Sequence, residues 1–364
     1  MTVPVVAILG GGQLGRMLAQ AGQRLGVACR LLDPDPDAPA GAVAPTITAA
    51  WDDARALSRL VSGATVATWE VEHVPLATVR RLAGQVPVFP PPACLEAVQD
   101  RACQKQLLDQ LGIATAPWAA PQSLEDLHAA VDRLGLPSVI KTRRGGYDGR
   151  GQAVLRRTGE AAEAWRRFGG HDLIVEGFIP FDDECSLVSV RAQDGSIRHW
   201  PLVENRHSDG VLATTLAPHP HWSAGLQEQA EQAMSRIMVR LDYVGVMAVE
   251  FFRCDGRLLV NELAPRVHNS GHWTMDGADC SQFENHLRAL LGWPLGGTGS
   301  RGHAAMVNCL GSVPEARGIR LPGVHRHDYG KIPRPGRKVG HLNIVGRDEV
   351  ERDGRLADLL RLIA

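Results

Sequence analysis

Lys141 and the glycine-rich segment after it have the composition of a polyphosphate-binding loop. An apolar run at residues 138–140 predicts a β-strand ending at Lys141, and residues 142–151 then hold four glycines and three arginines. A flexible, cationic loop can close over a polyphosphate, neutralise it and exclude water. It is not a Walker loop, because the lysine precedes the glycines. A surface hairpin would also use glycine, but three arginines beside a buried lysine favour phosphate binding.

Two glutamates inside apolar segments form a second candidate site. Glu250 lies within residues 246–252 and Glu262 within 258–263, which are expected to form a hairpin around Asp255-Gly256. A carboxylate in an apolar strand must be paired or metal-bound, because burying a lone charge is costly. We predict that Glu250 and Glu262 hold Mg²⁺, which leaves its other positions to phosphates and water. The alternative is two structural ion pairs with nearby arginines.

The register of this hairpin tests the shared metal site. A regular hairpin with a two-residue turn would pair Glu250 with Asn261 and send Glu262 to the other face. Both carboxylates face one metal only if the loop has an odd number of residues or the hairpin contains a bulge. Gly256 favours a bulged turn, so we expect an irregularity here.

A glycine-rich turn also occurs near the start of the chain. Residues 10–15 satisfy G-x-G-x-x-G directly after an apolar run, and Asp33 lies where a dinucleotide fingerprint places an acid. The glycines and a helix N-terminus could bind a phosphate. Arg16 favours a monophosphate over a ribose hydroxyl, because its planar fork matches phosphate oxygens. A tight turn without a ligand is the alternative.

The elements that position these residues alternate between strands and helices, as in an α/β protein. The run Pro90-Pro91-Pro92 marks a boundary, and residues 296–302 a second linker. Expected strands cover residues 3–9, 27–32, 66–69, 86–89, 137–141, 174–176, 184–191, 246–252 and 258–263. Expected helices cover residues 13–25, 76–82, 95–112, 124–135, 226–241, 283–291 and 355–363.

Length and composition limit the class of protein. The 364 residues suit two or three domains, and a net charge of −1 gives no sign of nucleic-acid binding. Seven scattered cysteines without a C-x-x-C pair argue against a zinc site and a disulfide framework. No apolar run approaches the length of a membrane span, and the N-terminus does not resemble a targeting segment. A cytoplasmic location is expected.

The motifs together resemble the ATP-grasp superfamily. Within it, the sequence is similar to the N5-carboxyaminoimidazole ribonucleotide synthetases, also described as ATPase subunits of phosphoribosylaminoimidazole carboxylase. The resemblance runs from about residue 5 to 345, and its most specific segments are residues 10–17, 69–73, 99–101, 141–152, 176–187, 204–207, 261–273 and 334–343.

The resemblance implies a mixed α/β and α+β architecture with three domains. A Rossmann-like pre-ATP-grasp domain would cover residues 1–98 and bind a ribonucleotide. An ATP-grasp domain would cover 99–294, with a mobile lid at about 116–176, and a small C-terminal domain would cover 295–364. The implied enzyme is a homodimeric, Mg²⁺-dependent ligase of purine biosynthesis. It would use ATP and bicarbonate to carboxylate 5-aminoimidazole ribonucleotide through carboxyphosphate, leaving ADP and phosphate.

The resemblance also assigns nucleotide-binding residues. Arg101 and Lys141 would neutralise the phosphates, the segment after Glu176 would contact adenine, and Glu184 would bind the ribose. The complete expected ATP site is Arg101, Lys141, Gly146, Tyr147, Asp148, Gly149, Arg150, Gly151, Gln152, Glu176, Gly177, Phe178, Ile179, Glu184, His207, Asn261 and Glu262.

Arg266, His268 and Asn269 are assigned to bicarbonate and carboxyphosphate, because an arginine fork and neutral donors stabilise oxyanions. A single histidine is more often a core residue, but this one lies in a polar loop bounded by proline and glycine. Tyr147 and Asp148 would orient the aminoimidazole and handle its proton. A simple Tyr-Asp-Gly turn explains them equally well, and both interpretations stay open.

The expected ribonucleotide site draws on both ends of the chain. Clustered basic residues near the C-terminus usually form a solvated face, but Pro335 and Gly336 make this one a rigid turn. The resemblance places it at the substrate phosphate, opposite the first glycine turn, with Glu72 near the aminoimidazole. The expected residues are Gln13, Leu14, Gly15, Arg16, Glu72, Lys331, Arg337 and Lys338.

Three other functions compete with this one. A sister ATP-grasp ligase, such as a glycinamide ribonucleotide transformylase or a biotin carboxylase, would share the nucleotide site. An NAD-dependent dehydrogenase would explain residues 10–15 but not Lys141 or the acidic hairpin. A non-catalytic nucleotide sensor would not need Glu250 and Glu262.

Overall fold

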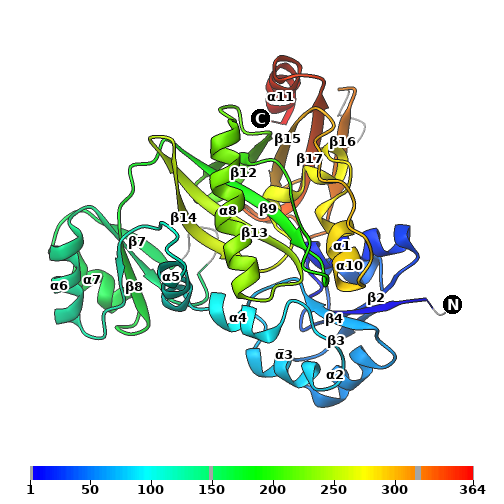
Figure 1. The fold of residues 1–364 in the computed structure, drawn as a ribbon, viewed down its shortest axis with the longest axis horizontal. Coiled ribbons are helices and arrows are strands. Elements are labelled where there is room, and N and C mark those ends of the chain that lie inside the picture. The colour runs from blue at the N-terminus through cyan, green and yellow to red at the C-terminus, as the bar shows by residue number, and fades with distance from the viewer. Residues whose placement is uncertain (1–2, 147–150, 316–320, 364) are drawn as a thin grey trace.

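The computed structural model describes residues 3–146, 151–315 and 321–363 (Figure 1). Its N-terminal part is a parallel sheet with the strand order β3-β2-β1-β4. The expected opening is confirmed, because β1 (Val5–Leu9) leads through the glycine turn into α1 (Gln13–Leu25) and then β2 (Ala28–Asp33). This sheet also contains β3 (Thr46–Thr48) and β4 (Val66–Trp69), and its further helices are η1 (Pro39–Ala42), α2 (Ala54–Val61) and α3 (Leu76–Ala83).

Two elements expected between residues 86 and 112 are wrong. Residues 86–89 form no strand but a single parallel bridge between Val88 and Ala67. Pro87 within this segment and Pro90 directly after it lack the N–H groups that a longer ladder needs. The expected helix 95–112 is two helices, α4 (Pro92–Val98) and α5 (Arg101–Gln110). Asp100 separates them, because its side chain accepts a hydrogen bond from Ala102 N (2.9 Å) and caps α5.

A small antiparallel sheet forms a separate lobe, at the left of Figure 1. Its strand order is β5-β8-β6-β7, and α6 and α7 pack against it. The elements are β5 (Trp118–Ala119), α6 (Leu124–Leu134), β6 (Ser138–Thr142), β7 (Gln152–Leu155), α7 (Glu160–Arg167) and β8 (Leu173–Gly177). Lys141 lies in β6, shortly before the glycine-rich loop. This lobe lies within the expected lid.

The described strands after β8 build one large sheet with the path β14-β13-β9-β11-β12-β15-β17-β16, and β10 pairs with β9. The last strands of the chain therefore extend the same sheet that carries the acidic hairpin. The strands are β9 (Asp183–Arg191), β10 (Ile197–His199), β11 (Val203–Ser208), β12 (Val211–Ala217), β13 (Gly245–Cys254), β14 (Arg257–Ala264), β15 (His303–Leu310), β16 (Val324–Asp328) and β17 (Lys338–Gly346).

Helices join this sheet to the other parts. Helix α8 (Ala224–Arg240) packs on β9 and β14, and α10 (Gln282–Leu290) packs on β13 and on α1 of the N-terminal part. The terminal helix α11 (Glu349–Ile363) begins earlier than expected and covers β15 and β17. Between α8 and α10 in the chain lie η2 (Asn269–Gly271) and α9 (Thr274–Gly277). Among the described helices, none has both the length and the apolar character needed to cross a membrane.

Candidate active site

The hairpin of β13 and β14 places both acidic side chains at one register position. Its two-residue turn, Asp255-Gly256, has positive φ at both residues (48° and 74°), and pairing is regular as far as Phe251 with Val260. The register then shifts, and Glu250 pairs directly with Glu262. Asn261 is therefore the extra residue of a bulge. The expected irregularity is confirmed, but its expected position at the glycine turn was wrong.

The environment of Glu250 is strongly negative. Burial and the neighbouring carboxylate of Glu262 raise the pKa of Glu250 to about 7. His268 Nε2 lies 3.4 Å from Glu250 Oε1, and this imidazole is neutral because burial lowers its pKa to about 3. The neutral His268 therefore does not offset the negative charge that the two acids carry when ionised, as expected of a cation-binding site.

Arg101 connects the acidic hairpin with the glycine-rich loop. As the first residue of α5, it lies 3.4 Å from Glu262 Oε2 and donates hydrogen bonds to the carbonyl oxygens of Thr142 and Gly146 (3.2 Å each). Arg143, in the same loop, binds Asp100 in a two-point contact of 2.8 and 2.9 Å. Arg101 beside the loop and Arg143 within it thus bring positive charge to the segment that was predicted to bind phosphates.

Lys141 belongs to a buried charge cluster that the sequence analysis did not find. Its Nζ lies 3.2 Å from Glu176 Oε2, and Lys105 Nζ lies 3.3 Å from the same oxygen. Lys105 is almost fully buried and also contacts Thr115 Oγ1 (2.5 Å). A signal existed, because Lys105 follows Arg101 by four residues and so shares its helix face. The cluster places two positive charges against one negative charge.

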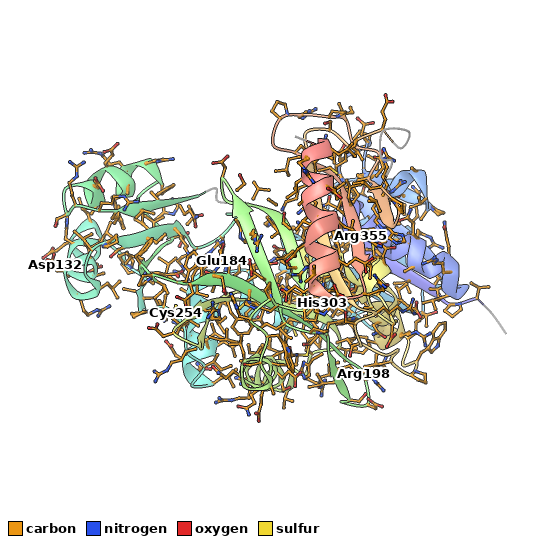
Figure 2. The ribbon with its side chains drawn as sticks, turned by 90° about the horizontal axis from the view of Figure 1, so that it is seen from above. Asp132, Glu184, Arg198, Cys254, His303 and Arg355 are labelled. Atoms are coloured by element: carbon orange, nitrogen blue, oxygen red, sulfur yellow. The ribbon has the colours of Figure 1, made fainter. Side chains whose placement is uncertain are left out.

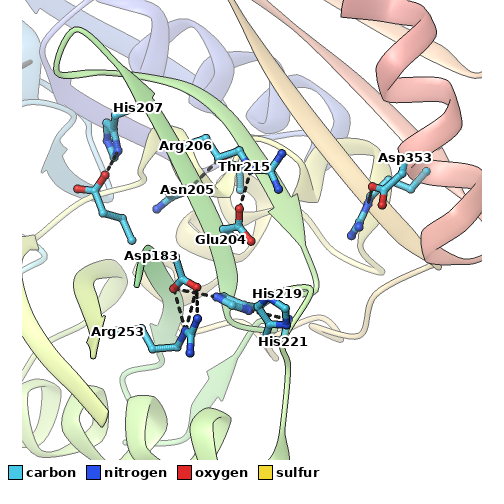
Figure 3. A network of polar contacts seen from close by, with 12 residues as sticks. Asp183, Glu204, Asn205, Arg206, His207, Thr215, His219, His221, Arg253 and Asp353 are labelled. Atoms are coloured by element: carbon cyan, nitrogen blue, oxygen red, sulfur yellow. Dashed lines mark hydrogen bonds and ion pairs between the residues drawn. The ribbon is translucent and has the colours of Figure 1, made fainter. Parts of the chain in front are cut away.

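The expected ribose end of the site lies between the small lobe and the main body. In Figure 2, Glu184 lies between Asp132 of the lobe and His303 of the body. Its carboxylate oxygen Oε2 lies 2.7 Å from His207 Nδ1, and His207 is labelled in Figure 3. Burial lowers the pKa of His207, but the hydrogen bond and charge of Glu184 outweigh it, so the pKa is raised. Gly177 is the last residue of β8, Phe178 and Ile179 follow it, and Phe178 is exposed.

A second polar network lies beside this end of the site (Figure 3). Asp183, Cys185 and His219 hold their potential ligand atoms within 4.8 Å of one another. The Asp183 carboxylate, however, accepts hydrogen bonds from Arg253 (2.5 and 2.9 Å) and lies 3.3 Å from His219 Nε2. Its negative charge is therefore already compensated, which identifies the network as structural.

The first glycine turn is filled by the chain's own carboxylates. Glu70, which is 2% exposed, accepts hydrogen bonds from Gly12 N (2.7 Å) and Gly15 N (3.1 Å). Asp33 accepts one from Gly11 N (2.7 Å). These acids occupy the donors that a dinucleotide phosphate would need, so the dehydrogenase alternative loses its binding site. Glu70 lies two residues before Glu72, and the same segment could have indicated it.

Residues of the expected substrate site come together from distant parts of the sequence. Glu72 forms a two-point ion pair with Arg266, in which Nη2 lies 2.9 Å from Oε1. Burial alone would raise the pKa of Glu72, but Arg266 lowers it to about 2. Gln13 Oε1 accepts a hydrogen bond from Lys331 Nζ (2.5 Å), which joins the two ends of the chain.

The remaining predicted substrate residues are placed less uniformly. Arg16 donates to the carbonyl of Pro39 (3.1 Å), Arg337 donates to that of Ile332 (3.2 Å), and Leu14 is buried in the core. The charge of Lys338 acts on Glu250 and His268. It therefore lies on the side of the acidic hairpin.

The loop after β14 holds groups without internal partners. Asn269 buries both polar atoms of its amide, and neither finds a hydrogen-bond partner in the described part of the chain. Such orphaned groups are rare unless a ligand or water satisfies them. Arg266 and His268 lie on the same loop; His268 contacts Glu250 of the acidic pair, whereas the Arg266 guanidinium is paired with Glu72. Tyr147, Asp148, Gly149 and Arg150 lie outside the described residues, whereas Gly146, Gly151 and Gln152 flank them.

The fold and this arrangement define the class of the protein. Residues 106–283 match the family model of the ATP-grasp domain, and residues 3–99 match the ribonucleotide synthetase preATP-grasp domain. Residues 304–355 match the C-terminal domain of phosphoribosylaminoimidazole carboxylase. The chain is an ATP-grasp protein with its two accompanying domains, as its sequence predicted.

Three relatives narrow the class to a family. The N5-carboxyaminoimidazole ribonucleotide synthase of Pseudomonas aeruginosa is 47% identical over 98% of this chain and 99% of its own length. The synthetase structure from Thermus thermophilus has a TM-score of 0.95 and 49% identity, covering 99% of this chain and 98% of that one. An Aspergillus clavatus synthase in complex with ADP and 5-aminoimidazole ribonucleotide has a TM-score of 0.91 and 27% identity, with coverages of 99% and 98%. The chain belongs to the N5-carboxyaminoimidazole ribonucleotide synthase family.

Proposed function

We propose that this chain couples cleavage of ATP to the carboxylation of 5-aminoimidazole ribonucleotide by bicarbonate, giving N5-carboxyaminoimidazole ribonucleotide, ADP and phosphate. The observation that carries the proposal is the position of Asn269. Its unsatisfied buried amide lies in the loop that also bears Arg266 and His268, beside the paired acids. An oxyanion site next to a nucleotide site is what activation of bicarbonate requires. The Aspergillus relative binds both ADP and the proposed acceptor.

Bicarbonate is a poor electrophile, so its activation comes first. Transfer of the γ-phosphoryl group to a bicarbonate oxygen gives carboxyphosphate, and the substrate amine then attacks its carbon or the CO₂ released from it. Arg101 and Lys141 neutralise the phosphates, because charge neutralisation and positioning dominate catalysis of phosphoryl transfer. Arg266, His268 and Asn269 hold the bicarbonate oxygens. Tyr147 and Asp148 remain the proposed contacts to the aminoimidazole.

The residues of the hairpin fit a magnesium ion. Glu250 pairs with Glu262 beside the bulged residue Asn261, and within the described part of the chain Arg101 forms an ion pair with Glu262 while Glu250 contacts the neutral His268. Oxygen ligands of this kind suit Mg²⁺, which would supply positive charge to neutralise the phosphates. Ionisation of Glu250 then depends on the cation replacing its proton.

The biological setting is part of the same proposal. We place the reaction in de novo purine biosynthesis, in the cytoplasm, and carried out by a homodimer. Seven free cysteines among the described residues suit a reducing compartment. Sedimentation of the purified protein tests the dimer, and a monomeric mass at assay concentration would contradict it.

ADP release tests the activity against its rivals. With ATP and Mg²⁺ present, we expect rapid ADP release only when both bicarbonate and 5-aminoimidazole ribonucleotide are added. Release that responds to glycinamide ribonucleotide with formate, or to biotin, would instead support a sister ligase. Removal of Mg²⁺ with a chelator should stop release, and its restoration should return it.

A further inference from the structure

Gln282 holds the backbone of His268 at two points. It is the first residue of α10 and is fully buried. Its Oε1 accepts a hydrogen bond from His268 N (2.8 Å), and its Nε2 donates one to His268 O (2.7 Å). The side-chain amide therefore pairs with both polar groups of one residue, as a neighbouring β-strand would.

The rest of the loop is built around this same amide. A Cβ atom at Gly271 would lie 2.6 Å from Gln282 Oε1, so only glycine fits there. Thr274 Oγ1 accepts from Gln282 N (3.0 Å) and donates to Gly271 O (2.6 Å). The side chain of Gln282 thus contacts His268 and the space beside Gly271, and its backbone N–H holds Thr274, without touching the predicted nucleotide contacts.

This anchoring sets the orientation of the His268 imidazole. Its Nδ1 accepts from Ser270 N (3.3 Å), which leaves the proton on Nε2, 3.4 Å from Glu250 Oε1. Asn269, with its unsatisfied amide, is the next residue. A change in the backbone at His268 would move both groups relative to the acids.

We propose that Gln282 is a positioning residue for carboxylation. It holds His268 and Asn269 where they retain the activated bicarbonate until the amine attacks. The inference rests on the proposed function. It separates two steps, since Gln282 would govern the fate of carboxyphosphate and not the binding of ATP.

Two substitutions test this role. Gln282→Met keeps most of the volume and removes both hydrogen bonds, while Gln282→Glu keeps the shape and loses the donor. We expect product formation to fall at least about tenfold, because displacement of reacting groups by about 1 Å is costly. The KM for ATP should stay within about twofold of the wild type, since those contacts are untouched. ADP release should exceed product, because unretained carboxyphosphate decomposes.

Gln227 provides a matched control. Its amide also clamps backbone, accepting from Leu202 N (2.8 Å) and donating to Trp200 O (3.2 Å), outside the candidate site. Gln227→Met should lower Tm as Gln282→Met does but keep ADP and product stoichiometric. Adding Gln282→Met to His268→Ala should cost less activity than Gln282→Met costs in the wild type, because Gln282 acts in part through the His268 side chain.

Three results would overturn the inference. They are stoichiometric ADP and product in both Gln282 variants, excess ADP of equal size in Gln227→Met, and additive losses in the double variant. If Gln282→Met does not fold, Gln282→Glu decides alone. Wild-type ADP release that ignores bicarbonate would contradict the proposed function itself, and it is measured before any variant.

Discussion

The two glycine-rich turns of this chain share a composition but differ in what surrounds them. At the first, Glu70 and Asp33 accept the N–H groups of Gly11, Gly12 and Gly15. At the second, Arg101 donates to carbonyl oxygens on the loop, and Lys141 lies one residue before the end of the preceding strand. The first turn is closed by internal anions, whereas the second is bordered by cations.

This difference shows why a glycine pattern alone does not identify an anion site. Glycine permits close approach to the backbone, but the approaching group can be a side chain of the same protein. A Cβ atom at Gly12 would lie 2.7 Å from Glu70 Oε1, so the glycines of the first turn admit a carboxylate. The charge of the neighbouring residues decides whether a ligand phosphate is bound.

The largest expected effect is at the acidic hairpin beside the second turn. Glu262→Gln removes a negative charge required for the proposed metal, and turnover should fall on the order of 1000-fold. Steady-state ADP release and thermal unfolding measured together separate this loss from misfolding. Glu96→Gln, which removes the exposed partner of Arg80, is the control and should keep full activity. Near-normal turnover in Glu262→Gln would contradict the metal assignment.

A smaller pair of effects should distinguish the second turn from the side chain of Arg16, which lies on the helix after the closed first turn and is not one of its backbone donors. Lys141→Met should lower kcat/KM for ATP about 100-fold and leave the KM for the ribonucleotide unchanged, because one phosphate cation is lost. Arg16→Met should raise the KM for the ribonucleotide about tenfold and leave that for ATP unchanged, since a charged hydrogen bond is worth about 1.5–3 kcal/mol. Equal effects of Arg16→Met on both substrates would remove this distinction.

The smallest expected effect concerns stability at the first turn. Burial, opposed by hydrogen bonds from Gly12 and Gly15, raises the pKa of Glu70 to about 6 from its ordinary value of 4.5. Folding therefore favours the protonated acid, and this contribution is complete below pH 4.5 and lost as pH rises through about 6. Relative to Glu70→Gln, which does not titrate, wild-type stability should fall by about 2 kcal/mol over that interval. Urea unfolding at several pH values measures it.

Activity provides the control for that experiment. Glu70→Gln should leave the KM for ATP unchanged, because Glu70 faces the first turn. A stability difference that does not vary with pH would show that the Glu70 carboxyl is not perturbed as described.

The sequence predicted the elements whose signals are local. The hairpin of Glu250 and Glu262 was recognisable because its acids interrupt apolar strands, and an irregular register was expected because a shared metal site requires both acids on one face. The bulge lies at Asn261 instead of the glycine turn, while β13 keeps a regular register with β9 on its other edge. Pairing with a distant strand is invisible in a local pattern.

The residues missed by the sequence analysis act through distant contacts. Lys105 and Lys141 meet only at Glu176, on three different elements, and each looks like an ordinary charged residue in its own segment. Glu70 reaches Gly12 across 58 positions of sequence. In the sequence, Gln282 looks like an ordinary polar residue at the start of a helix. Only the structure shows that its side-chain amide is hydrogen-bonded to the backbone of His268. The roles assigned to individual site residues, and the domain boundaries at 98 and 294, stay predictions.

Transfer of oxygen from bicarbonate tests the central claim most directly. Bicarbonate labelled with ¹⁸O is supplied with ATP and 5-aminoimidazole ribonucleotide, and the released phosphate is analysed by mass spectrometry. If Arg266, His268 and Asn269 hold bicarbonate for phosphoryl transfer, one labelled oxygen should appear in the phosphate for each product formed. Phosphate without label, at the same rate of product formation, would show that carboxyphosphate is not formed and would contradict this account.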